Sequence, residues 1–221
     1  MPVLSESNNL GDVLKFEAPN MFSREEITVL AGSGSDRSIA VGEVVAKRTL
    51  SDITVTPDGG NTGDGTAGAV TLGSMAEVGA YALICISAAA NAGTFQVLTP
   101  KGYRLHDLDV GQAYAGDHLN LTIADGAADF IVGDSITIDI SGDNKIVAMD
   151  LAGVDGSQNP IGITAAAITA PDGTDIKGVA IVRDAILADN ALTWPVGITT
   201  PQKTDAITAL EGRGILVRKG V

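Results

Sequence analysis

The stretch AYALICISAAANAGTFQVLT, residues 80–99, indicates the fold class most directly. It contains two apolar and β-branched runs separated by a short turn, a pattern typical of paired strands. Similar runs surround it: AVTLG at 69–73, HLNLTIADG at 118–126 and DSITIDISG at 134–142. Their spacing of roughly ten residues per strand is typical of a small β-sandwich or barrel. We therefore expect residues 51–142 to form a β-domain.

Shorter strand-like runs lie on both sides of this segment. Two precede it, FSREEITVLAG at Phe22–Gly32 and SIAVGEVVAKRTL at Ser38–Leu50. Four follow it and are separated by turns such as DGSQNP and PDGTD: NKIVAMD, GITAAAIT, GVAIVRDAIL and GILVRKG. Gly and Pro between such runs favour strand ends rather than continuous helices. The flanking parts are therefore also predicted to be β-rich.

One helix signal occurs, close to the C-terminus. Thr200 can cap a helix, Pro201 suits the first helical position, and Gly212 suits the position just past the end. The apolar face of this helix would consist of Ala206, Ile207 and Leu210. The predicted fold class is therefore mainly β, with a small β-rich domain that carries one short C-terminal helix, plus an inserted sandwich-like or barrel-like domain.

Composition excludes several classes of function. The 221 residues include 14 Lys and Arg against 27 Asp and Glu, giving a net charge of −13. Residues 57–142 hold 10 acidic and 2 basic residues, so most of the excess lies in the middle segment. Such a chain is a poor partner for nucleic acid, because phosphate binding needs clustered Lys and Arg. A single cysteine excludes an internal disulfide framework and a cysteine-based zinc site.

No apolar run is long enough for a membrane-spanning helix, and the N-terminus lacks the pattern of a signal peptide. We therefore expect synthesis in the cytoplasm and no membrane partner.

Candidate sites for catalysis or metal binding are weak. The stretch DGGNTGDG at Asp58–Gly65 resembles a calcium loop, but Ala69 stands where an EF-hand needs a glutamate, so a flexible linker or turn is favoured. GSGSDR at Gly32–Arg37 lacks the GK[ST] ending of a phosphate loop, which favours a hairpin loop. We expect no metal and no cofactor.

The individual residues that could take part in catalysis or binding also have structural explanations. His106 and His118 lie among aspartates and could bind metal or transfer protons, but no nucleophile motif accompanies them and solvated turns are favoured. Cys85 lies in an apolar strand and is expected to be a buried small hydrophobe. Trp194, followed by Pro195, is interpreted as a packing anchor or a contact with a partner. The residues alone therefore predict a β-rich protein that is not an enzyme.

The two flanking parts together resemble the head decoration protein family of lambda-like tailed bacteriophages. The resemblance rests on LGDVLKFEAPNMFSREEITVLAG at Leu10–Gly32 and VGEVVAKRT at Val41–Thr49, then on KIVAMDLAGVDGSQNPIGITA at Lys145–Ala165. AIVRDAI, LTWP and GILVRKG follow in the same order. The middle segment splits these motifs, and it looks like an insert found in some phage and prophage decoration proteins.

The resemblance implies a capsid-stabilising (cement) protein in the virion. Such proteins form homotrimers that bind the major capsid protein at three-fold and quasi-three-fold positions of the expanded head. They stabilise the head against internal DNA pressure, and they lie on its outer surface. An N-terminal arm at residues 1–20, mobile when free, would bind the capsid through Val13, Leu14 and Phe16. Trp194 and Pro195 would serve packing or trimer contacts.

The resemblance also implies a division into domains. Residues 21–50 and 143–221 would form the trimerising domain, and residues 51–142 an acidic insert that projects outward. The insert could contact a host surface or a glycan. The alternative function is an Ig-like surface adhesin or glycan-binding module, and a small hydrolase that uses one of the two histidines is a third class.

Overall fold

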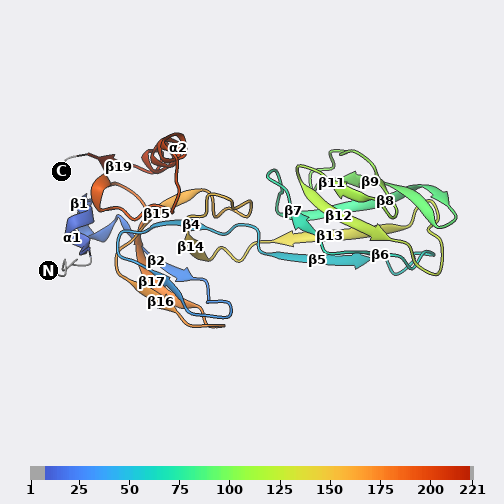
Figure 1. Ribbon diagram of the computed structural model, residues 1–221, viewed down its shortest axis with the longest axis horizontal. Coiled ribbons are helices and arrows are strands. Elements are labelled where there is room, and N and C mark those ends of the chain that lie inside the picture. Colours follow the sequence, from blue (N-terminus) through green and yellow to red (C-terminus); the bar gives the residue numbers. More distant parts are fainter. Residues whose placement is uncertain (1–7, 220–221) are drawn as a thin grey trace. The chain divides into compact units, whose positions relative to one another are not determined.

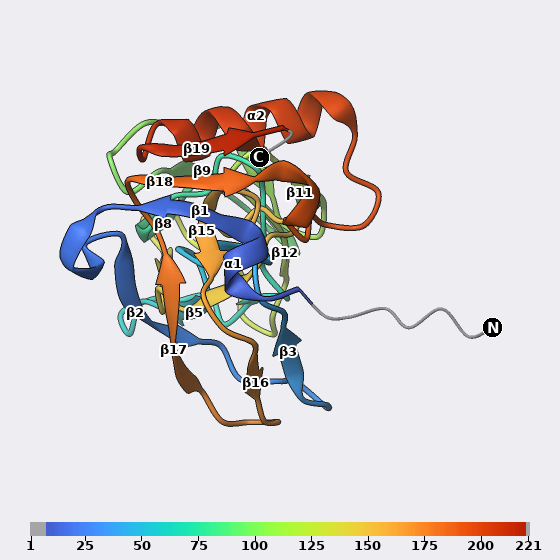
Figure 2. The ribbon, with the colours of Figure 1, turned by 90° about the vertical axis from the view of Figure 1, so that its left-hand side faces the viewer.

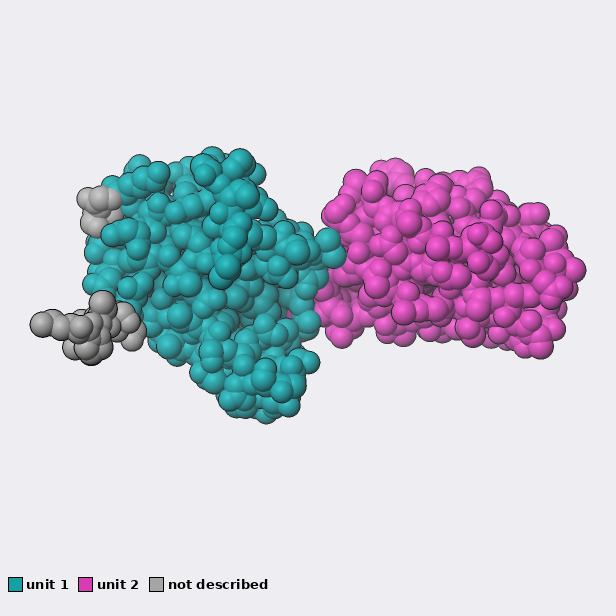
Figure 3. All heavy atoms as spheres, viewed as in Figure 1, with its two compact units in different colours: residues 1–48, 144–221 teal, residues 49–143 magenta. Residues whose placement is uncertain are grey.

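The computed structural model describes residues 8–219. The chain divides into two compact units (Figure 3). Unit 1 comprises residues 1–48 and 144–221, and unit 2 comprises residues 49–143. The structure is mainly β with one longer helix near the C-terminus, so the predicted fold class is confirmed (Figure 1).

Unit 1 is built around a closed five-stranded barrel with the strand order β14-β2-β17-β15-β4. Its strands are β2 (Arg24–Val29), β4 (Val44–Lys47), β14 (Ile146–Ala148), β15 (Pro160–Thr164) and β17 (Ile176–Ile181). A two-stranded sheet joins β3 (Arg37–Ile39) to β16 (Ile168–Ala170). In β2 the side chains of Ile27 and Val29 are buried and that of Thr28 is exposed, as expected for a strand with one face on a core.

A second sheet of unit 1 has the order β1-β18-β19, with β18 and β19 parallel. Its strands are β1 (Leu14–Glu17), β18 (Ala185–Ala188) and β19 (Ile215–Arg218). The helical segments are α1 (Leu10–Val13), α2 (Thr200–Glu211) and the 3₁₀ turns η1 (Pro19–Met21) and η2 (Asp189–Ala191). Figure 2 shows α2 running alongside β19, with β18 and β1 beyond it. Ala206 and Leu210 of α2 are buried in the core between helix and sheet.

The predicted C-terminal helix exists and ends at Glu211, so Gly212 lies just past its end as predicted, but the N-cap differs from the prediction. Thr199, not Thr200, is the N-cap, because its backbone N–H donates to Gln202 Oε1 at 2.9 Å. Gly212 keeps right-handed helical angles, and the left-handed residue is Gly214 with φ +76°. The left-handed residue therefore lies two positions after Gly212, directly before β19.

Unit 2 contains two sheets that share one core. The larger has the order β10-β9-β8-β13-β5, and the smaller consists of β11, β12, β6 and β7. Their bounds are β5 (Asp52–Pro57), β6 (Thr66–Ala67), β7 (Thr71–Leu72), β8 (Gly79–Ala89), β9 (Ala92–Leu98), β10 (Leu108–Asp109), β11 (Ala113–Ala115), β12 (Leu119–Ala124) and β13 (Ser135–Ser141). In β13 the buried Ile136, Ile138 and Ile140 alternate with exposed residues, which is the pattern that predicts such strands.

The insertion point is a β-hairpin of unit 1. β4 and β14 pair antiparallel, with Ile146 opposite Lys47, and the backbone N–H of Arg48 donates to Lys145 O at 2.9 Å. Unit 2 thus occupies the place of the loop that would join these two strands.

Candidate functional site

The N-terminal segment of unit 1 is folded from residue 8 onward. Asn8 Nδ2 donates to Ala191 O at 2.9 Å, and the Val13 side chain is completely buried. Gly42, at φ +71°, allows this burial, because a Cβ there would lie 2.6 Å from Val13 Cγ2. β1 then pairs antiparallel with β18, with a register shift between Leu14 and Phe16.

The mobility of the expected arm over residues 1–20 stays a prediction, and the structure describes the contacts of part of this segment. Residues 1–7 lie outside the described part of the chain, whereas residues from Asn8 onward contact η2 and β18. Of the three proposed capsid-binding residues, Val13 is in the core and Leu14 is half-buried against it. Only Phe16 is well exposed, at 54%. Val13 therefore serves the fold, because its side chain has no free surface.

A turn that follows β1 displays two further apolar side chains. Met21 is 68% exposed and Phe22 is 56% exposed. Asn20 and Met21 both have left-handed angles, with φ 61° and 59°, which is costly for a residue such as methionine. The buried Ser23 fixes the turn: its hydroxyl donates to Asp184 O at 2.8 Å and accepts from Ala18 N at 2.9 Å. Phe16 thus lies on the strand before this hydrogen-bonded turn, Met21 and Phe22 lie in the turn, and sequence reasoning missed the last two.

Ion pairs surround this turn. Arg24 donates twice to the Glu17 carboxylate, both at 2.8 Å, and these hydrogen bonds lower the pKa of Glu17. Arg183 pairs with Glu25, and its guanidinium lies 5.4 Å from the centre of the Phe22 ring. The exposed Phe22 ring is therefore held in place by a cation on one side.

Trp194, which Pro195 follows in the chain, packs against the same hydrophobic core as Val13. Trp194 Nε1 donates to Asp189 Oδ1 at 3.3 Å, and Lys203 Nζ lies 5.1 Å from the centre of its ring. Lys203 also pairs with Asp189 at 2.6 Å. These contacts fasten η2 to α2 within one chain. Pro195 is half-buried, and Val196 next to it is fully exposed, so a trimer contact at this place stays a prediction.

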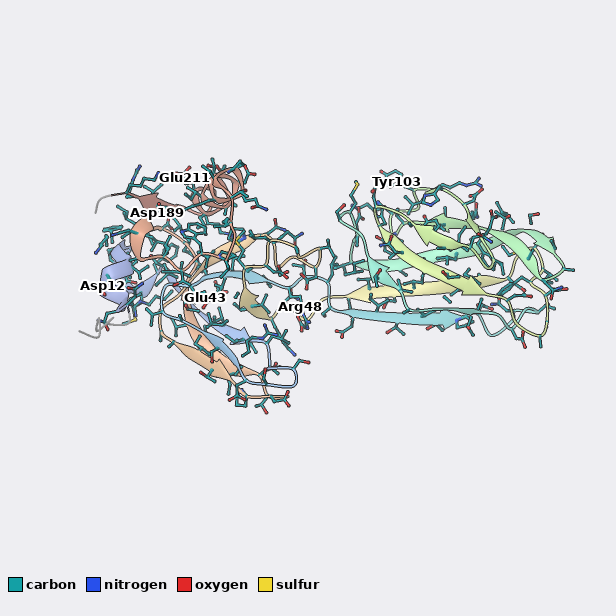
Figure 4. All side chains as sticks on the ribbon, viewed as in Figure 1. Asp12, Glu43, Arg48, Tyr103, Asp189 and Glu211 are labelled. Carbon is teal, nitrogen blue, oxygen red and sulfur yellow. The ribbon has the colours of Figure 1, made fainter. Side chains whose placement is uncertain are left out.

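The two ends of unit 1 are distinct. Asp12 of α1 lies at one end of this unit, and Arg48, where unit 2 is inserted, lies at the opposite end (Figure 4). The insertion point and α1 therefore lie at opposite ends of unit 1.

In unit 2, both histidines border one surface pocket of about 270 Å³. The His106 ring stacks on Tyr114, with ring centres 4.1 Å apart and planes at 15°. His118 Nδ1 is 3.0 Å from the Tyr81 hydroxyl, which also accepts from Glu77 N. Within residues 8–219, no group of three or more His, Cys, Asp or Glu is arranged to hold a metal ion.

The Asp58–Gly65 stretch is a structured loop. The Asp134 carboxylate accepts N–H donors from Thr62 at 3.0 Å, Gly63 at 2.8 Å and Ile131 at 3.0 Å. Asn61 bridges the same region, donating to Ser135 O and accepting from Ser135 N. Sequence reasoning missed Asp134, which is 4% exposed and follows Gly133 in an unremarkable turn.

The remaining sequence candidate, Cys85, is buried in the core of unit 2 as predicted, and burial raises the pKa of its thiol. In the same described range, no helix has both the length and the apolar character needed to cross a membrane.

Comparison with known proteins identifies the family. The family model "Bacteriophage lambda head decoration protein D" matches residues 3–215, nearly the whole chain. The chain belongs to the lambda head decoration protein family. This confirms the predicted resemblance and a structural, virion-associated role in capsid decoration. Head decoration proteins are structural proteins of the capsid rather than a family of enzymes.

Other comparisons add little to the head decoration assignment. No curated protein matches the chain. Two crystal structures of Xanthomonas campestris FlgL match in part, each with 17% identity and a TM-score of 0.32. They cover 46% and 49% of this chain, and the chain spans about a third of their length, 32% and 31%. A likeness this weak supports no conclusion about fold or function.

Proposed function

We propose that the protein binds the expanded phage head as homotrimers, at three-fold and quasi-three-fold positions, and stabilises it against the pressure of packaged DNA. The family membership carries this proposal, because it already establishes a capsid decoration role. The partner is the major capsid protein. The mechanism is mass action: a ligand that binds only the expanded state lowers the free energy of that state. Several contacts per trimer add avidity.

The proposed capsid-binding surface is the N-terminal side of unit 1. It contains the exposed Phe16, Met21 and Phe22, all on one fixed turn and its flanking strand. Apolar side chains held rigidly lose little entropy when a partner covers them. Because Arg48 lies at the end of unit 1 opposite Asp12 of α1, we also propose that the insert projects outward from the capsid (Figure 4). The Ig-like adhesin alternative does not account for family motifs on both sides of the insert.

Capsid binding can be tested with one substitution. Phe16→Asp is expected to weaken binding to expanded capsids by about tenfold to a hundredfold. This is the change in affinity expected when the burial of one aromatic side chain is lost. The melting temperature should stay nearly unchanged, because Phe16 is 54% exposed. The measurement is co-sedimentation with expanded and unexpanded capsids of the cognate phage. Tyr103→Asp, at a 69% exposed aromatic of unit 2, is the matched control and should bind normally.

Equal binding by wild type and Phe16→Asp would remove Phe16 from the interface. Absence of any binding to expanded capsids by the wild type would contradict the proposed function itself.

The second test removes unit 2. Deleting residues 49–143 joins Arg48 directly to Asn144, which already has the left-handed φ of 56° that short hairpin loops use. β4 and β14 should therefore remain paired, and unit 1 should fold alone as a trimer. Light scattering on the shortened protein measures its mass; a folded monomer would show that trimerisation needs the insert. Retained co-sedimentation with capsids would show that unit 1 holds the binding surface.

A further inference from the structure

The segment of unit 1 that leads into α2 carries one apolar side chain, Val196, that its own subunit leaves fully exposed. It stands on a tight turn, in which Ile198 N donates to Pro195 O at 3.2 Å. Gly197 has φ +81°, as a type II turn requires at that position. The base of the turn is fixed by the Trp194 side chain, which contacts both η2 and α2. A branched side chain on so fixed a turn loses little entropy when a partner covers it.

A hollow of about 210 Å³ borders α2 in the same unit. Its apolar lining comes from the helix, from the segment after β14 and from β15: Met149, Leu151, Pro160, Ala206 and Ala209. Met149, Pro160 and Ala206 are buried, whereas the polar Gln202 and Asp205 at its border are exposed. The deepest part of the hollow is therefore apolar, and polar groups lie nearer its mouth, as in the core and rim of protein–protein contacts.

Val196 and the hollow adjoin opposite sides of α2. Four helix residues border the hollow: Gln202, Asp205, Ala206 and Ala209. Four others border a groove that is also bordered by Ile198 of the Val196 turn: Thr200, Lys203, Thr204 and Ile207. The two sets have the same spacing but are offset by two residues, which is about 200° around a helix of 3.6 residues per turn. One subunit therefore presents a projecting side chain and a recess on different faces.

Two different faces are what a closed ring of identical subunits needs. In a two-fold dimer the same patch meets itself, whereas in a three-fold ring one face of each subunit meets another face of the next. Charge favours the second arrangement. Lys219 borders the groove on the Val196 side, and Asp205 borders the hollow. A head-to-tail contact thus brings unlike charges together, and contact of either face with itself brings like charges together.

We propose that Val196 of one copy of this chain docks in the hollow of the next copy, and that this head-to-tail contact closes the homotrimer. The inference rests on the proposed function, which requires a homotrimer, and deepens it by naming the two faces that meet. The trimer contact expected at Trp194 and Pro195 is thereby assigned to the adjacent Val196. Trp194 itself acts within its own subunit, where it holds the turn in place.

Cross-linking tests the pairing of the two faces. The double variant Val196→Cys with Ala209→Cys places one thiol on each face of the full-length protein. A short bis-maleimide cross-linker should convert it to covalent dimers and trimers on denaturing gels. Each single variant should stay almost entirely monomeric, because its thiols lie on like faces. Wild type is the background control, since its one cysteine, Cys85, is 1% exposed.

A single substitution tests the contact without chemistry. Val196→Asp should raise the dissociation constant of the trimer by about tenfold or more, the change expected when burial of an aliphatic side chain is lost. Sedimentation velocity over a range of concentrations measures it. The near-ultraviolet circular dichroism of Trp194 should not change, because the subunit itself stays folded. Val132→Asp, at a 63% exposed valine of unit 2, is the matched control and should remain trimeric.

Three results would overturn the inference. They are a Val196→Asp trimer of wild-type stability, a double cysteine variant that gives no cross-linked species, and efficient cross-linking of Val196→Cys alone, which would indicate a two-fold contact. A wild type that sediments as a monomer at every concentration would overturn it as well. Capsid binding can fail separately: a wild-type trimer that does not co-sediment with expanded capsids would contradict the proposed function and leave the head-to-tail contact standing.

Discussion

Val13→Asp is expected to destabilise unit 1 by about 3 kcal/mol or more, because it places an unpaired carboxylate in an apolar core. Val13 is completely buried among residues of β18, η2 and α2. For a domain of this size the change corresponds to a fall in melting temperature of roughly 10 °C. Calorimetry measures the shift, and hydrogen exchange followed by mass spectrometry shows where the protection is lost. The loss should be confined to peptides of unit 1.

Phe16→Asp is the matched control for this substitution. It introduces the same charge three residues later, on a side chain that is 54% exposed, and should leave the melting temperature nearly unchanged. The two variants therefore separate folding from capsid binding within one short segment. A Val13→Asp protein with wild-type stability would show that residues 8–17 are not docked on the domain in solution, and would restore the interpretation of a mobile arm.

The difference between Val13 and Phe16 shows where sequence reasoning ends. The segment LGDVLKF has no periodicity that distinguishes a docked strand from a free one. Its burial depends on pairing with β18, more than 160 residues later in the chain, and on a glycine at position 42. Polar residues punctuated by Asn, Gly and Pro predicted an arm that could not fold alone, but these local signals contain no information on such distant partners.

Elements set by local patterns were predictable. The run DSITIDISG predicted the strand β13, and Thr200, Pro201 and Gly212 predicted the helix α2. The sequence indicated only some of the residues that border the pocket of unit 2. His106 and His118 were noted as a pair, but Tyr114 and Gly116 became relevant only through the stacking that the fold creates. Likewise, nothing in the sequence distinguished Met21 and Phe22 from buried apolar residues. Their exposure follows from the left-handed turn.

The Asp58–Gly65 loop is expected to depend on one carboxylate. Burial of the Asp134 side chain favours its neutral form, but three backbone N–H donors outweigh burial and lower its pKa. Two of these hydrogen bonds hold residues 62 and 63 against the Phe130 ring, where a Cβ on Gly63 would lie 2.5 Å from Phe130 Cδ1. The loop is thus tied to the core of unit 2 by a charged acceptor and by close packing on an aromatic ring.

Asp134→Asn is expected to cost about 2–4 kcal/mol, because an amide –NH₂ would face at least one backbone N–H that now donates to the carboxylate. Since the folded-state pKa is lower than the unfolded one, the stabilisation by Asp134 is complete above the unfolded value of about 3.9 and is lost as the pH falls through the folded value. Wild-type unit 2 should therefore lose stability below about pH 4.

In Asp134→Asn this component of the acid sensitivity should be absent, while stability near pH 7 is already lower. Urea unfolding of both proteins between pH 3 and pH 7 measures the two slopes, with hydrogen exchange at residues 58–65 as the local readout. Asp139→Asn, at an exposed carboxylate of β13, is the matched control and should follow the wild-type curve. Parallel curves for wild type and Asp134→Asn would mean that the loop is held by its packing on Phe130 rather than by the carboxylate.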